Sequence, residues 1–239
     1  MSRSATQTRT RILSAAASEI LAVGYGSATL SSIAARIGVT KGALAYHFPT
    51  KAAVASSLFD HLQACHQHMR DEIRAHGIRG ARALVTLVVG VHALTQTDPV
   101  YAAAFATVVL PTTTHLDVPP VLPSCAEVFA DHLREARADG ETPPDIDPVA
   151  AGEDLLAVTL GMYALRAQHP TRHDTQPFRL LRRHLVAIGI TGAGAIVDDV
   201  LAASPSYEAS VSSSADSTWS DAAARSSMAL SRCRCGVMP

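Results

Sequence analysis

The segment of this 239-residue chain with the most evident binding chemistry lies between its only two lysines, Lys41 and Lys51. Just upstream, Ala34, Gly38 and Leu44 have the spacing of a helix-turn-helix, with a glycine four positions after a small residue and an apolar residue six positions later. The small residue lets two helices cross closely, the glycine adopts the left-handed backbone of the turn, and the leucine packs one helix on the other. Because this geometry mainly serves to lay a helix in the major groove, the segment predicts DNA binding.

The second helix of this motif offers groups that suit phosphates and base edges. Lys41 can reach a phosphate or guanine, and Ala43 can touch a thymine methyl group. Gly42 costs a helix about 1 kcal/mol relative to alanine, which indicates a steric need for a small residue. We assign DNA contacts to eight residues that cap or line this surface: Thr29, Thr40, Lys41, Gly42, Ala43, Tyr46, His47 and Lys51.

Two of these assignments have an alternative. Lys51 lies in the first turn of the next predicted helix, where a cation opposes the helix dipole unless a phosphate binds there. A solvated surface lysine is the other interpretation. His47 either donates to a phosphate or packs as a satisfied histidine at the base of the domain.

Charge is distributed unevenly along the chain. Residues 1–51 hold six basic residues and one acid, Glu19, for a local net charge of +5, whereas the whole chain carries −1 and the remainder therefore −6. In a protein with a basic N-terminal segment (here called the basic head) and an acidic remainder, the basic segment is attracted toward phosphate.

Apolar residues recur with helical spacing throughout, which predicts an all-α fold. We expect helices near 6–23, from 30, from 41, from 51 past 70, and near 80–96, 99–110, 123–138, 147–168, 176–189 and 194–203. The expected organisation is a flexible basic N-terminus (1–7), a three-helix DNA-binding domain (8–68), a helical ligand-binding and dimerisation domain (78–203) and a disordered Ser/Ala-rich tail (204–239).

The first sixty residues resemble the N-terminal domain of TetR-type transcriptional regulators. The resemblance rests on four segments that hold their spacing together: residues 8–16, 24–25, 29–34 and 38–51. It implies an all-helical homodimer, usually a repressor, which binds a pseudo-palindromic operator and releases it when a small molecule binds. Ala45 is a departure, because the family commonly has a phosphate-contacting tyrosine there, whereas this chain has Tyr46 one position later.

The second half resembles the γ-butyrolactone-receptor branch of that family, in the Pro119-Pro120 pair and in residues 132–137 and 145–150. That branch typically has a pocket tryptophan near the position of Ser124, whereas the only tryptophan here is Trp219. Two ligand classes therefore stay open, a γ-butyrolactone-type signal and an antibiotic or its precursor.

Candidate pocket residues lie on two stretches, 84–110 and 155–163, where an apolar residue at helical spacing is more often plain core than ligand wall: Leu84, Val88, His92, Tyr101, Phe105, Val109, Thr159 and Met162. We expect dimerisation through a small-residue face and an apolar stripe on the last two long helices: Ala150, Ala157, Gly161 and Ala164, with Phe178, Leu181, Leu185 and Ile188.

Other functions are less well supported by the sequence. His61, Cys65 and His68 share one helix face at metal-ligand spacing, but no fourth ligand is evident, and we assign no metal and no cofactor. The sequence contains no nucleophile elbow, P-loop or dinucleotide fingerprint, so no such motif points to an enzyme. A regulator that binds DNA without a ligand stays an alternative. No apolar run reaches the roughly 20 residues of a membrane span, and the polar N-terminus lacks a signal-peptide core, so we expect a cytoplasmic, nucleoid-associated protein without membrane partners.

Overall fold

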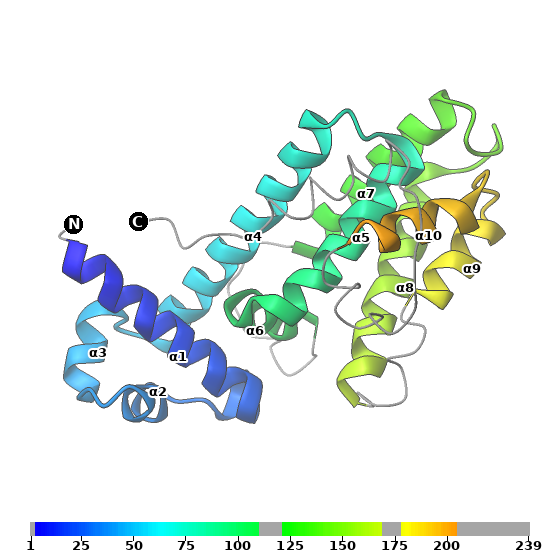
Figure 1. The fold of residues 1–239 in the computed structure, drawn as a ribbon. Coiled ribbons are helices and arrows are strands. Elements are labelled where there is room, and N and C mark those ends of the chain that lie inside the picture. Colours follow the sequence, from blue (N-terminus) through cyan, green and yellow to red (C-terminus); the bar gives the residue numbers. More distant parts are fainter. Residues whose placement is uncertain (1–2, 110–120, 169–177, 205–239) are drawn as a thin grey trace. The chain divides into compact units, whose positions relative to one another are not determined.

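The computed structural model describes residues 3–109, 121–168 and 178–204, and every regular element within these ranges is an α-helix, as the sequence predicts (Figure 1). The described residues form two compact units. The first comprises residues 3–68 and 92–109, and the second comprises 69–91, 121–168 and 178–204. The expected tail lies largely outside the described residues, as do Trp219 and the two C-terminal cysteines.

The first unit is built on α1 (Arg3–Ser27), α2 (Leu30–Arg36), α3 (Lys41–His47) and the first part of α4 (Lys51–Ala75). It also includes the end of α5 (Gly80–Thr97) and all of α6 (Pro99–Val109). Helix α1 packs on α2 and on α6, and α2 packs on α3. The shared core is apolar and fully buried, and it includes Ile12, Ala16, Ile33, Leu44 and Phe48.

Helix α1 differs from the expected element at both ends. It begins at Arg3, so residues 3–7, which we expected to be a flexible N-terminus, are helical. At the other end Gly24 interrupts the helical backbone with φ 79° and ψ 154°. A turn of helix then continues to Ser27, because the Ala28 amide donates to the Gly24 carbonyl across the kink.

The second unit contains α7 (Val121–Ala138), α8 (Pro148–Gln168), α9 (Arg179–Ala187) and α10 (Ala193–Ala202), together with the ends of α4 and α5. Helices α7 and α8 pack closely because Gly152 has no side chain. A Cβ there would lie 2.8 Å from the Ala126 carbonyl oxygen. Two carboxylates hold the start of α5, since Glu135 accepts from the Gly80 amide and Glu141 from the Ala81 amide.

The apolar stripe of α9 corrects one expectation. Leu181 and Leu185 are fully buried and Phe178 is 3% exposed, because this side of α9 faces the core of the second unit, next to α8. These three residues are therefore not available to a second copy of the chain. The large apolar side chains of α9 that remain exposed are Leu180 and Val186.

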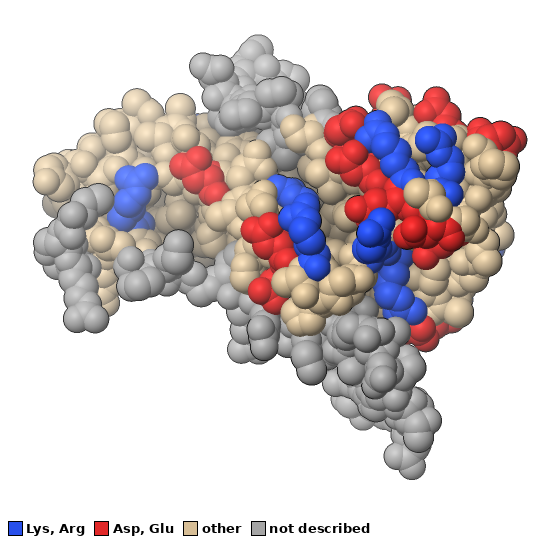
Figure 2. All heavy atoms as spheres, turned by 90° about the horizontal axis from the view of Figure 1, so that it is seen from above, with Lys and Arg blue, Asp and Glu red and all other residues tan. Residues whose placement is uncertain are grey.

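On the face shown in Figure 2, acidic and basic side chains lie close together on the right-hand side of the view. In the second unit, Arg134 pairs with Glu127 and Asp131. Among the described residues, no single helix is long and apolar enough to cross a membrane. Helices α5 and α6 pass that test only as a pair, by length and composition, and they are bent by 114°.

Candidate DNA interface

The turn between α2 and α3 has the geometry that its glycine predicts. Gly38 has φ 68°, and its amide donates to the Ala35 carbonyl at 3.3 Å, while the Val39 amide donates to the Ala34 carbonyl at 3.1 Å. These two bonds form a Schellman motif, which ends α2 at its C-cap and starts the turn. Ala34 and Leu44 are buried where the helices cross, so all three positions of the motif do what their spacing predicts.

Threonine caps fix the starts of both helices. The Thr29 hydroxyl accepts from the Ser32 amide at 3.0 Å, and the Ser32 hydroxyl accepts from the Thr29 amide at 3.1 Å, which completes a capping box. The Thr40 hydroxyl accepts from the Ala43 amide at 3.1 Å. Both threonines are exposed, and their hydroxyls orient the helices in the free protein.

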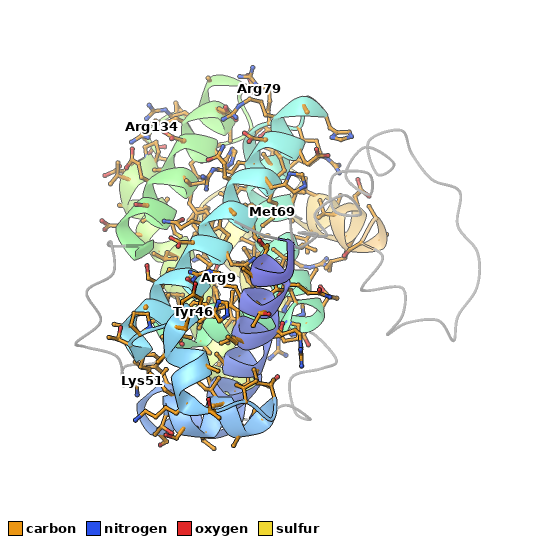
Figure 3. All side chains as sticks on the ribbon, turned by 90° about the vertical axis from the view of Figure 1, so that its left-hand side faces the viewer. Arg9, Tyr46, Lys51, Met69, Arg79 and Arg134 are labelled. Carbon is orange, nitrogen blue, oxygen red and sulfur yellow. The ribbon has the colours of Figure 1, made fainter. Side chains whose placement is uncertain are left out.

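The outward face of α3 has little covering it. Lys41, Gly42 and Ala43 are exposed, and the Tyr46 side chain is 86% exposed, with its ring edge against His47 (Figure 3). A Cβ on Gly42 would meet only the Thr40 hydroxyl, at 3.9 Å. The fold itself therefore does not require a glycine at this position, which agrees with a steric need set by an external partner.

Lys51 is held inside the domain. It lies at the start of α4, as expected, but its ammonium donates to the carbonyls of Tyr25 at 2.9 Å and of Gly26 and Ala28 at 3.1 Å. It also lies 4.5 Å from the centre of the Tyr25 ring. The Lys51 ammonium is unfavourable at the start of α4, because it opposes the dipole of that helix. It also neutralises the carbonyls at the end of α1, and this interaction offsets the unfavourable one. A phosphate contact by Lys51 stays a prediction, and the geometry adds a structural role.

Arg9 has a positioning role that its sequence context did not indicate. Its guanidinium donates to the His47 carbonyl at 3.1 Å and to the Ser57 hydroxyl at 2.6 Å, and it lies 4.2 Å from the centre of the Phe48 ring. Arg9 thereby joins α1 to the end of α3 and to α4 (Figure 3). The separations along the chain, 38 and 48 residues, explain why no local pattern identifies these contacts.

Arg36 is also engaged within the chain. Its Nε donates to Glu19 at 2.5 Å, which ties the end of α2 to α1. The hydrogen bonds from Arg36 and then from Ser32 lower the pKa of Glu19 below its ordinary value. In contrast, Arg11 and Lys41 are exposed.

The candidate pocket residues are divided between the two units. Leu84, Val88, Thr159 and Met162 belong to the second unit, and His92, Tyr101, Phe105 and Val109 belong to the first. Of the polar members, Thr159 donates to the Leu155 carbonyl of its own helix at 2.8 Å.

In the first unit, Tyr101 is fully buried. Its ring stacks on Phe105, with 6.1 Å between ring centres, and its hydroxyl bonds the buried His66 at 2.7 Å. Ser124, at the position where the related branch has its tryptophan, is exposed on α7.

A capped helix-turn-helix with an uncovered second helix, at the start of an all-helical chain, is the arrangement found in DNA-binding transcriptional regulators. Residues 12–58 match the family described as bacterial regulatory proteins, tetR family. The N-terminal segment of this chain therefore matches the DNA-binding domain of that family.

Known relatives agree with this placement. The transcriptional regulator TtgR of Pseudomonas putida is 38% identical over 65 residues, which is 27% of this chain and 31% of TtgR. The chain thus matches about a third of that relative's length. CprB from Streptomyces coelicolor, solved in complex with its biological operator sequence, is 27% identical, with 81% of this chain and 94% of CprB covered and a TM-score of 0.65. An ArpA-like γ-butyrolactone receptor shares the fold, with 22% identity, 96% of this chain and 97% of the receptor covered, and a TM-score of 0.67.

Proposed function

We propose that this chain is a homodimeric repressor that binds a pseudo-palindromic operator through α3 and leaves it when a small molecule binds. The observation that supports this most directly is the outward face of α3, which carries an 86% exposed tyrosine and an exposed lysine. The opposite side of this helix packs into the core through the fully buried Leu44. An aromatic side chain exposed to this degree gains from a partner that covers it.

Each exposed group of α3, together with the half-buried His47, has a role on DNA in this proposal. Lys41 binds a phosphate or guanine O6 and N7, and Ala43 contacts a thymine methyl group. Gly42 allows the backbone to approach the groove, while Tyr46 and His47 donate to phosphates. Thr29 and Thr40 act by fixing the helix starts, because their hydroxyls already cap α2 and α3.

Dimerisation uses the surface of α8 and α9 that the subunit leaves uncovered. Ala150 and Ala157 on α8 are exposed, and a Cβ on Gly161 of the same stripe would have no atom within 4 Å. The exposed Leu180 and Val186 supply apolar area on α9. Two-fold pairing through this face would present two reading heads to two half-sites.

The effector in this proposal is a γ-butyrolactone-type signal or an antibiotic or its precursor. The sequence resemblance of the second half to the γ-butyrolactone-receptor branch motivates these classes. Ligand binding shifts the population of dimers toward a spacing of the two heads that no longer fits successive major grooves.

The test is a gel shift of the purified chain on the DNA upstream of its own gene, at two salt concentrations, with and without an organic extract of the producing culture. A specific, salt-sensitive shift that the extract abolishes supports the proposal. A specific shift that neither the extract nor pure compounds of either effector class changes refutes ligand release and leaves a ligand-independent regulator. The Tyr46→Ala variant is the control for binding through α3.

A further inference from the structure

Three side chains with metal-binding atoms meet in the first unit, away from α3. His61 and Cys65 lie one turn apart on α4, and Asp98 precedes α6. The donor atoms of the three residues lie within 4.8 Å of one another. His61 Nε2 is 2.7 Å from Asp98 Oδ2 and 3.6 Å from Cys65 Sγ.

One of these two distances matches a tetrahedral zinc site, and the other is shorter than such a site requires. With a Zn–S bond of about 2.3 Å and a Zn–N bond of about 2.05 Å, tetrahedral geometry places the sulfur and nitrogen roughly 3.6 Å apart. The observed separation of Sγ and Nε2 already has this value. A nitrogen and an oxygen ligand would lie roughly 3.3 Å apart, so His61 and Asp98 need to separate by about 0.6 Å when a cation replaces the proton between them.

The two oxygens of Asp98 have separate partners, which leaves one of them for a cation. Oδ1 accepts from the backbone amides of Val100 and Tyr101, at 2.9 and 3.0 Å, and so caps α6. Oδ2 accepts only from His61 among the hydrogen bonds of the described residues. A cation on Oδ2 would leave the cap of α6 in place.

Burial and charge at the cluster suit a cation. Cys65 is 1% exposed, and the side chains of His61 and Asp98 are each 19% exposed, so the cluster is sheltered and has a path to water. Asp98 brings a carboxylate oxygen to the cluster, since its Oδ2 lies 2.7 Å from His61 Nε2.

We propose that His61 Nε2, Cys65 Sγ and Asp98 Oδ2 bind a divalent cation of the zinc class, with water as the fourth ligand. Binding releases the thiol proton of Cys65 to solvent, since the thiolate is the ligand, and the imidazole binds as the tautomer with its proton on Nδ1. The soft thiolate and the imidazole favour zinc over magnesium or calcium. His68, which the sequence places on the same helix face, is not part of the cluster.

A cation at this position joins α4 to the start of α6. Helix α6 packs on α1 within the unit that carries α3, and Lys51 ties the start of α4 to the end of α1. The bound cation is therefore expected to stabilise the unit that reads DNA.

The test uses the full chain in a background that lacks the other cysteines. Cys233 and Cys235 can bind zinc by themselves, so Cys125→Ser, Cys233→Ser and Cys235→Ser are combined first. Zinc affinity is measured by competition with a chromophoric chelator, and cobalt is used as a spectroscopic probe. We expect one equivalent of metal and a thiolate-to-cobalt charge-transfer band in this background.

Two single variants of that background are decisive. Cys65→Ser removes the thiolate, and Asp98→Asn weakens the Oδ2 ligand while an amide oxygen can still cap α6. Each is expected to lower zinc affinity by more than about 100-fold, since loss of an outer-shell partner alone costs 10–100-fold. Circular dichroism and the operator gel shift without metal show whether each variant is folded. A folded background that binds less than one equivalent of zinc, or a Cys65→Ser variant that binds it as tightly as its parent, would overturn the proposal.

Discussion

Replacement of Gly42 by alanine should move stability and DNA affinity in opposite directions. Gly42 is the second residue of α3, and an added Cβ meets only the Thr40 hydroxyl at 3.9 Å. Its backbone is not left-handed, so alanine fits without strain. The variant should gain up to about 1 kcal/mol of unfolding free energy. For a chain of this size that gain corresponds to about 2–4 °C in melting temperature.

The same methyl group extends the α3 surface by roughly one carbon–carbon bond, about 1.5 Å, toward the groove. If the backbone of α3 approaches DNA at Gly42, the contacts on either side of it cannot all form. We expect operator affinity to fall by about 10-fold or more, which corresponds to at least about 1.4 kcal/mol.

Urea unfolding followed by circular dichroism and fluorescence anisotropy with an operator duplex measure the two quantities. Gly194→Ala is a matched control, because Gly194 is also the second residue of its helix, α10, and its new Cβ would make an ordinary contact of 3.6 Å with Arg182. This control should gain similar stability and bind DNA as the parent does. Unchanged operator affinity in Gly42→Ala would refute the close approach, and lost stability would refute the description of an open Gly42.

The other predictions concern charge and assembly. Lys51→Met should lower the unfolding free energy, measured with urea, by about 1–2 kcal/mol, because three hydrogen bonds from a half-buried ammonium are lost. If Lys51 also contacts a phosphate, the variant will show a smaller salt slope, which is the dependence of the logarithm of operator affinity on the logarithm of salt concentration. Lys41→Gln should leave stability unchanged and reduce that slope by about 0.9 for each bound head. Because folding lowers the pKa of Glu19, this carboxylate stabilises the fold fully at a pH above its ordinary pKa of 4.5, and the stabilisation is lost as the pH falls through the lower pKa of the folded state. The urea midpoint of the Glu19→Gln variant should therefore fall less steeply than that of the parent between about pH 5 and pH 3. Val186→Glu, at a 61% exposed position, should give a folded monomer in sedimentation, whereas the fully buried Leu185→Glu should unfold the chain.

The local parts of the DNA interface could be predicted from the sequence. Gly38 adopts a positive φ and Thr40 caps α3, because a turn glycine and a cap threonine act through their neighbours within a few residues. Helix boundaries were predicted to within a few residues for the same reason. Among the helix starts that the structure describes, that of α1 is clearly earlier than its apolar stripe indicates.

Contacts between distant residues were not predictable. The sequence suggested that Lys51 faces a phosphate, but its partners are carbonyls 23–26 residues earlier in the chain. Asp98 joins His61 across 37 residues, so no spacing pattern places it near Cys65. The apolar stripe of α9 was predicted to be a dimer surface, because periodicity shows that a helix face is apolar but not what covers it. In the structure, Leu181 and Leu185 of this stripe are buried within the second unit.

The basic head also shows why a count of charges is not a count of contacts. Of the cations among residues 1–51, Arg9, Arg36 and Lys51 are each hydrogen-bonded within the chain, to a carbonyl, a carboxylate or a hydroxyl. They still contribute to the positive field that steers the head toward DNA. Their side chains hold α1, α2, α3 and α4 together, so releasing them onto phosphate would loosen the scaffold that aims α3. Under the proposed function, attraction and contact are therefore divided between different residues. Among the described side chains, the proposed direct contacts fall to exposed groups such as Lys41 and Tyr46.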